Sequence, residues 1–296
     1  MDIADIDLRL LRVFLTVVRA GGFTAAQAML NISQSTVSNQ IKALETRLGV
    51  RLCDRGRAGF RLTTDGIKIV DAAERLLHSI EEFKSETLAL KGRLAGDIRI
   101  GIVDNTVNDP KSPIIRLLAD LTEPIHEIRP LITVGDPQSL ELDITSGRLD
   151  AAIGVFPAQI SSLARMPFYV EDQGFFCSDR NRLFAKHPVT MDDIHGSRVI
   201  SRSYWRLTDL QRVGMHDFGG IANSMEAALA LILTGNFLGF LPAHVAKPYV
   251  QEGRLRRLLA ETLSYRAEIV VIFKAGGSKT PLMTNLIDCC RRNAWG

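Results

Sequence analysis

The chain has 296 residues, of which 46% are hydrophobic and 23% are charged, and its formal net charge is +3. This composition is ordinary for a globular protein of two or three domains and excludes a mostly disordered chain. No apolar run approaches the roughly 18–20 residues of a membrane span, and three aspartates precede the first basic residue, which excludes a signal or transit peptide. We therefore expect a cytoplasmic protein without a membrane partner.

Three helices are predicted at the amino terminus. Residues 8–18 carry an apolar stripe that ends at Gly21-Gly22, and a short helix follows up to Leu30. Ser33 is expected to cap a third helix, which Gly49 ends. The apolar stripe of this third helix consists of Val37, Ile41, Leu44 and Leu48. Two helices joined by a few residues, the second one polar, are typical of a helix-turn-helix.

The remaining surface of the third helix is polar but almost free of charge, whereas a solvated helix face normally carries Glu, Lys and Arg. Short neutral groups suit the major groove of DNA, because Asn and Gln pair with adenine edges and Ser and Thr with bases or phosphates. The alternative is a helix of a structural core with an ordinary solvated face.

The stretch after Gly49 predicts a two-stranded wing with arginines directed to phosphates. Residues 33–61 hold six basic residues against two acidic ones, a local excess of +4, which indicates a polyanionic partner. The predicted DNA-binding residues of the helix and the wing are Ser33, Gln34, Ser35, Thr36, Ser38, Asn39, Gln40, Lys42, Arg51, Arg55, Arg57 and Arg61.

The run FTAAQAMLNISQSTVSNQIKALETRLGVRLCDRGRAGFRLTTDG closely resembles the DNA-binding module of the LysR-type transcriptional regulators. The similarity spans residues 6–66 and departs from the family at Cys53, where Phe is common. It implies a winged helix-turn-helix over residues 1–64 that binds double-stranded DNA, with RNA polymerase as a possible further partner.

Residues 65–92 predict one long linker helix, and about 26 helical residues at about 1.5 Å each give a length of about 39 Å. An apolar heptad seam runs along it, consisting of Ile69, Ala73, Leu76, Ile80, Phe83, Thr87 and Leu90. Such a seam predicts pairing with a second copy, and the resemblance implies a homodimer or a homotetramer. The alternative is a helix folded back onto the large domain.

From residue 93 to residue 296 strands alternate with helices, which predicts an α/β domain. The segments GDIRIGI, SGRLDAAIG and GNFLGFLP resemble the effector domain of the same family, which is similar to the periplasmic binding proteins. This implies two lobes, the first over residues 93–165 and 267–296 and the second over residues 166–266. The expected fold class is thus α/β: an amino-terminal winged helix-turn-helix, a long linker helix, and a two-lobed α/β effector domain.

Ligands of such domains bind at the carboxyl ends of strands and at helix N-termini. Hydroxyl and amide groups at these places suit a small carboxylate or another anion, which Arg202 could bind with two hydrogen bonds. The alternative for each residue is simple helix capping, and the long loop after Asp104 separates Asn105 and Thr106 from the next helix. The candidate effector-binding residues are Asn105, Thr106, Asp136, Ser201, Arg202, Ser203, Tyr204, Ser224 and Phe240.

The four cysteines, at positions 53, 177, 289 and 290, form no Cys-x-x-Cys pattern and lack histidines at metal-ligand spacing. We predict no metal and no cofactor, and expect buried thiols; a redox switch at Cys177 is the alternative. No catalytic motif is present. The sequence therefore predicts an effector-modulated, sequence-specific transcriptional regulator and no enzyme. The alternatives are a DNA-binding protein whose second domain only oligomerises, and an enzyme that uses the cleft.

Overall fold

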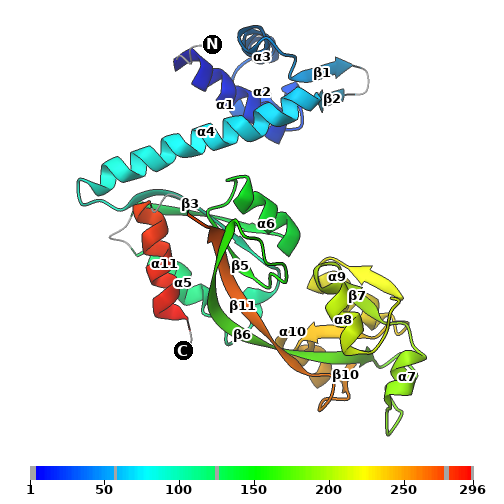
Figure 1. The fold of residues 1–296 in the computed structure, drawn as a ribbon. Coiled ribbons are helices and arrows are strands. Elements are labelled where there is room, and N and C mark those ends of the chain that lie inside the picture. The colour runs from blue at the N-terminus through cyan, green and yellow to red at the C-terminus, as the bar shows by residue number, and fades with distance from the viewer. Residues whose placement is uncertain (1–4, 57–58, 124–126, 277–279, 295–296) are drawn as a thin grey trace. The chain divides into compact units, whose positions relative to one another are not determined.

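The fold is described from a computed structural model, which covers residues 5–56, 59–123, 127–276 and 280–294, without the side chains of residues 5, 6, 55, 56, 206 and 207. The chain forms two compact units, each described by itself (Figure 1). The first unit comprises Met1–Lys84 with Ser146–Arg148, and the second comprises Ser85–Thr145 and Leu149–Gly296. The long helix that we expected as a separate linker is thus divided, and most of it belongs to the first unit.

The first unit consists of helices around one apolar core and a two-stranded wing. Its elements are α1 (Asp5–Arg19), α2 (Phe23–Leu30), α3 (Gln34–Leu48), β1 (Cys53–Gly56), β2 (Gly59–Leu62) and α4 (Thr64–Ala89). The predicted stripe of α3 supplies Val37, Ile41 and Leu44, each fully buried. At its ends, the Ser33 hydroxyl accepts a hydrogen bond from the Thr36 N–H, and Gly49 takes the left-handed conformation with φ 72°.

The first half of the expected dimer seam on α4 packs within the first unit. Ala73 is only 3% exposed in the core of the first unit, and Ile69 and Leu76 pack against that core. These three residues therefore contribute to the core of the first unit. Two later seam residues are exposed to solvent. Phe83 is 69% exposed, and Leu90, one residue past the end of α4, is 88% exposed.

The second unit is built on a mixed sheet with the strand order β10-β6-β11-β5-β3-β4, and β9 pairs with β6 outside this path. Its strands are β3 (Ala95–Ile102), β4 (Glu127–Val134), β5 (Ala151–Gly154), β6 (Leu163–Ser178), β9 (Gly239–Pro242), β10 (Leu255–Leu258) and β11 (Tyr265–Lys274). The strands β4 and β5 run parallel to β3, whereas β6 and β11 pair with each other in an antiparallel manner. The strands β7 (Ile200–Arg202) and β8 (Gly220–Ala222) form a separate parallel pair.

The long strands β6 and β11 run through two lobes (Figure 1). Phe168 and Ile269 lie in the core of the first lobe, whereas Phe175 lies in the core of the second. The change of lobe therefore falls inside β6, several residues after the expected boundary at residue 165. The first lobe carries α5 (Ile114–Leu121), α6 (Pro137–Thr145) and α11 (Pro281–Asn293); the second carries α7 (Met191–His195), α8 (Arg206–Arg212), α9 (Met225–Leu233) and α10 (Ala243–Gln251). No helix in the described part of the chain combines the length and the apolarity of a bilayer span.

Candidate DNA-binding surface and effector pocket

The surface of α3 presents the neutral side chains that the sequence indicated. Gln34, Ser35, Thr36, Asn39 and the basic Lys42 are exposed, whereas Ser38 and Gln40 are half-buried. The Ser33 hydroxyl lies within 2.8 Å of both the Ser35 and the Thr36 hydroxyls, so its role in the free protein is capping. The α3 face therefore offers hydrogen-bonding groups without a charge that would have to be desolvated.

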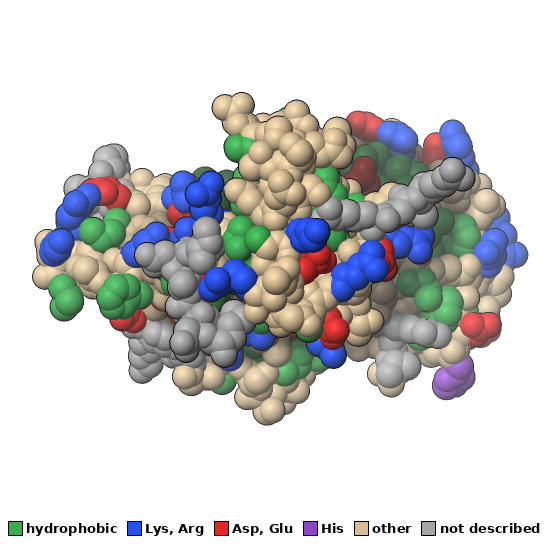
Figure 2. All heavy atoms as spheres, turned by 90° about the horizontal axis from the view of Figure 1, so that it is seen from above, with side chains coloured by type: hydrophobic (Ala, Val, Ile, Leu, Met, Phe, Trp, Pro, Cys, Tyr) green, Lys and Arg blue, Asp and Glu red, His purple; other side chains and the backbone are tan. Residues whose placement is uncertain are grey.

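The wing is an antiparallel pair in which Arg61 lies opposite Asp54. Arg61 is exposed, and the Arg51 guanidinium lies 3.3 Å from the Asp54 carboxylate. Of the other predicted wing residues, Arg57 and the side chain of Arg55 lie outside the described part of the chain. Figure 2 shows Lys and Arg side chains, in blue, exposed on the face of the molecule turned to the viewer.

Two contacts that the sequence did not indicate position this surface. Arg47, which we counted in the basic patch, forms an ion pair with the buried Asp7, so its charge is partly neutralised within the unit. The Glu45 carboxylate accepts hydrogen bonds from the N–H groups of Leu52, at 2.8 Å, and Cys53, at 3.3 Å. Glu45 therefore ties α3 to the start of the wing.

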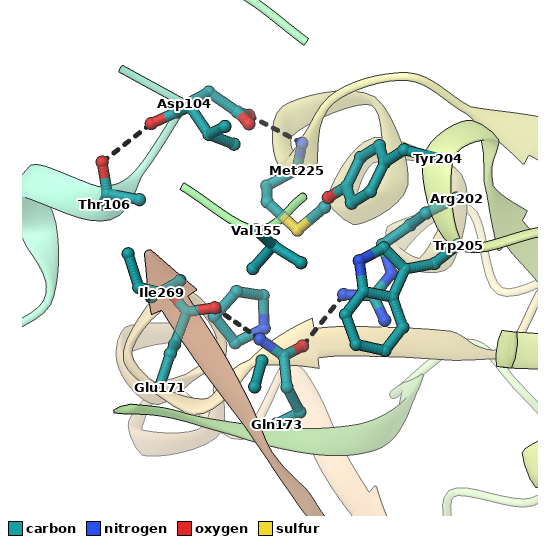
Figure 3. Close-up of a pocket in the computed structure, with 13 residues that line it drawn as sticks. Asp104, Thr106, Val155, Glu171, Gln173, Arg202, Tyr204, Trp205, Met225 and Ile269 are labelled. Atoms are coloured by element: carbon teal, nitrogen blue, oxygen red, sulfur yellow. Dashed lines mark hydrogen bonds between the residues drawn. The ribbon is translucent and has the colours of Figure 1, made fainter. Parts of the chain in front are cut away.

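The second unit contains a small enclosed pocket where its two lobes meet (Figure 3). Its volume is about 20 Å³, which is room for one water-sized group. Polar lining comes from Asp104, Thr106, Glu171, Gln173, Arg202, Tyr204 and Trp205, and Met225 closes one side. The structure thus brings together three of the predicted effector-binding residues, Thr106, Arg202 and Tyr204, with acidic groups that were not predicted.

Arg202 is buried and committed to a partner in its own lobe. It is 3% exposed, and its Nε and Nη2 donate hydrogen bonds to the two carboxylate oxygens of Asp209 at 2.9 and 2.7 Å. Its Nη1 donates to the Gln173 side chain at 3.0 Å. The expected bidentate contact with an effector anion is therefore already made within the protein, by Asp209.

The N–H groups at the start of α9 likewise have hydrogen-bond partners within the chain. Ser224 caps this helix by accepting a hydrogen bond from the Ala227 N–H at 3.2 Å, and the Asp104 carboxylate accepts one from the Met225 N–H at 2.7 Å. Because free N–H groups make a helix N-terminus attractive to anions, Asp104 takes the position that we expected for a ligand carboxylate. Nothing in the sequence pattern marked this contact, since 121 residues separate its two partners.

Glu171 is a second carboxylate in the pocket wall. It is 5% exposed, and its carboxylate accepts a hydrogen bond from the Gln173 side chain at 2.5 Å. Burial, with a smaller effect of the nearby Asp109, raises the pKa of Glu171 to about 8. The pocket wall is therefore acidic, which differs from the anion-binding character expected from the sequence.

The other candidate effector residues have different places. Thr106 donates its hydroxyl to the Val103 carbonyl, and Asn105 contacts the Asp104 carboxylate. Asp136 caps α6 through Ser139 and does not line the pocket. Ser201 and Phe240 are buried and do not line the pocket, and Ser203 begins the short 3-10 helix that carries Tyr204.

Two family models match the chain, each over one of these regions. Residues 8–67 match the bacterial regulatory helix-turn-helix protein of the lysR family, and residues 91–295 match the LysR substrate binding domain. The chain is 35% identical to the HTH-type transcriptional activator BauR of Pseudomonas aeruginosa, covering 93% of this chain and 91% of that protein. It is 27% identical to an HTH-type transcriptional regulator of Xanthomonas campestris pv. campestris, over 95% of this chain and 84% of the relative.

Solved structures show the same fold. CbnR, a LysR family transcriptional regulator, has a TM-score of 0.69 at 18% identity, covering 98% of this chain and 99% of its own. Full-length CbnR complexed with its target DNA has a TM-score of 0.68 at 20% identity, and the match covers 98% of this chain and 100% of the CbnR chain. Together, the two matched domains span both the α3 surface and the pocket, and the protein is therefore a member of the LysR family of DNA-binding transcriptional regulators.

Proposed function

We propose that this protein binds promoter DNA as a homodimer or homotetramer, and that a small molecule in the pocket of the second unit changes that binding. The observation that carries the DNA-binding part is the exposed, neutral, hydrogen-bonding face of α3. Within an HTH dimer, two such helices enter major grooves about one helical turn apart. Base edges would be read by Gln34, Ser38 and Asn39, while Arg51 and Arg61 would contact phosphates.

The Asp104–Met225 hydrogen bond supports a specific role for the effector. It joins the end of β3 in the first lobe to α9 in the second, so it favours the closed arrangement of the lobes. An effector carboxylate can reach the start of α9 only by displacing Asp104. Binding would then favour a different arrangement of the lobes, and this population shift would alter how the DNA-binding units are held on the promoter.

Substitution of Asp104 tests this role and the charge of the effector together. We expect Asp104→Asn to respond to small carboxylates at concentrations about tenfold lower than the wild type, because the competing charge is removed. The measurement is thermal stabilisation by a panel of small carboxylates and small amines, followed by a gel shift with promoter DNA. Asp136→Asn, outside the pocket, serves as the matched control.

Whether Asp104→Asn strengthens or abolishes the response distinguishes an anionic effector from a cationic one. A loss of the response in Asp104→Asn, with amines stabilising the wild type, would show that Asp104 binds a cationic group. If no small molecule stabilises the wild type, a second unit that only oligomerises is favoured instead. Cytoplasmic location is part of the same proposal, because promoter DNA lies there, and RNA polymerase is a further partner within it.

A further inference from the structure

Three side chains beside the pocket each bring one potential metal-ligand atom into a common cluster. They are Asp109, before α5, Glu171, on β6, and His244, in the first turn of α10. The His244 Nδ1 atom lies 3.8 Å from the Asp109 Oδ2 atom and 3.9 Å from the Glu171 Oε1 atom. All three atoms lie within 4.8 Å of one another. The side chains are only 8%, 6% and 6% exposed for His244, Asp109 and Glu171, so this is a buried cluster.

The second polar atom of each residue has its own partner. The His244 Nε2–H donates to the Asn105 carbonyl at 3.0 Å, because a carbonyl only accepts. In the neutral imidazole the lone pair is then on Nδ1, the nitrogen that faces the two carboxylates. Asp109 accepts the Lys111 N–H through Oδ1 at 2.9 Å, and Glu171 accepts Gln173 through Oε2 at 2.5 Å. Metal-binding histidines are typically held in this way, with the other ring nitrogen donating to a backbone carbonyl.

The atoms that face the centre of the cluster have no hydrogen-bond partner among the described residues. Their nearest polar neighbours are one another, at distances too long for a hydrogen bond. Two of the nearby cations have partners of their own: Lys111 pairs with Asp172 at 2.5 Å and Arg202 with Asp209 at 2.7 Å. Two carboxylates this close together are stable in their ionised form only when a positive charge lies between them.

We propose that Asp109, Glu171 and His244 bind a divalent transition-metal ion such as Mn²⁺, Co²⁺, Ni²⁺ or Zn²⁺. One imidazole and two carboxylates are donors that these metals accept, whereas Ca²⁺ and Mg²⁺ prefer oxygen ligands alone. Ligands about 2.1 Å from a tetrahedral metal lie about 3.4 Å apart, so the two distances from His244 to the carboxylates would shorten by about half an ångström. A dication would balance both carboxylates, which an ammonium group cannot do.

A route for the ion exists on the outer side of the cluster. Asp109 and His244 also line an open groove of about 400 Å³, to which Asp172, Lys247 and Gln251 contribute. On the inner side, Glu171 contacts Gln173, and Gln173 accepts a hydrogen bond from Arg202. A bound metal would therefore be connected to the effector pocket and would add the positive charge that an anionic effector needs there.

The test measures metal binding directly on the untagged, full-length protein after treatment with a chelator. Titration calorimetry and elemental analysis after dialysis against Mn²⁺, Co²⁺, Ni²⁺ or Zn²⁺ are expected to give one ion per chain. Glu171→Gln and His244→Gln should each weaken metal binding about 100-fold or more. Loss of a ligand should exceed the 10- to 100-fold effect of changing a group that only hydrogen-bonds to a ligand. Glu261→Gln, which removes an exposed carboxylate that lines neither the pocket nor the groove, should bind like the wild type.

Bound Co²⁺ provides a second readout, because coordination by the imidazole gives a visible absorption that should be absent in His244→Gln. Circular dichroism and promoter binding show whether each variant is folded. Wild-type protein that binds none of the four ions, or variants that bind them as tightly as the wild type, would contradict the proposal. Stabilisation of the wild type by ethylammonium but by none of the metals would also overturn it and would assign the cluster to an ammonium group. None of these results depends on the identity of the effector.

Discussion

The Arg202 guanidinium forms a buried bidentate ion pair with the Asp209 carboxylate, in which the side chains are 4% and 1% exposed. Asp209 therefore engages the two guanidinium nitrogens with which Arg202 would bind a carboxylate. The Trp205 ring lies 5.4 Å from the guanidinium carbon, and the Tyr265 hydroxyl accepts a hydrogen bond from Nη2 at 2.5 Å. Arg202 therefore lines the pocket as part of a buried network with Asp209 and Tyr265.

We predict that Arg202→Ala destabilises the second unit by about 3–5 kcal/mol, because it leaves the Asp209 charge buried without a partner. Urea unfolding followed by tryptophan fluorescence measures this change. The double variant Arg202→Met with Asp209→Leu should recover most of the loss, since neither charge remains. Arg254→Ala, which removes an exposed ion pair with Glu252, should cost at most about 1 kcal/mol.

On the DNA-binding surface, base-reading and phosphate-binding residues should behave differently. Asn39→Ala should weaken binding to the operator by about 1–3 kcal/mol with little effect on random DNA. Arg61→Ala should weaken both alike and lower the salt slope by about one unit. Fluorescence anisotropy at several salt concentrations separates the two cases.

Thr46→Ala is the control for this experiment, because Thr46 is exposed at the far end of α3, where a recognition helix leaves the base edges. Equal losses on operator and random DNA for Asn39→Ala would remove this residue from the base-reading set.

The exposed half of α4 should hold the oligomer together. Phe83→Lys places a charge on the 69% exposed Phe83 position, which costs little in the isolated unit but much in an apolar interface. Analytical ultracentrifugation should show smaller species and weaker operator binding. Lys84→Ala, beside it on the helix, should leave the assembly intact. An unchanged oligomer in Phe83→Lys would show that this stripe is not the interface.

Cys177 should be unreactive in the folded protein. It is fully buried, and burial raises the pKa of its thiol to about 11, so the reactive thiolate is scarce at neutral pH. Titration with a thiol reagent should label Cys177 only after denaturation. Rapid labelling of Cys177 in the native protein would instead support the alternative of a redox switch at this residue. The described part of the chain buries Cys53, Cys289 and Cys290 as well, so the same experiment reports on all of them.

Local patterns in the sequence determined the first unit. The 3.6-residue spacing of Val37, Ile41 and Leu44, the cap at Ser33 and the stop at Gly49 all act within a few residues, so the α3 helix and its polar face followed without the tertiary structure. The alternation of strands and helices determined the α/β class of the second unit in the same way. The resemblance of runs such as SGRLDAAIG to the effector domain of the LysR family predicted that this unit has two lobes.

Only the tertiary structure decided what the polar residues of the second unit contact. Asp104 and Met225 are separated by 121 residues, and Asp109, Glu171 and His244 come from three elements far apart in the chain. No local pattern predicts such pairs, because they depend on how β3, β6 and α10 pack. For the same reason the heptad of α4 could not reveal that Ala73 packs into its own unit while Phe83 stays exposed. A periodic stripe indicates that a face is buried, but the surface that covers it is determined by packing.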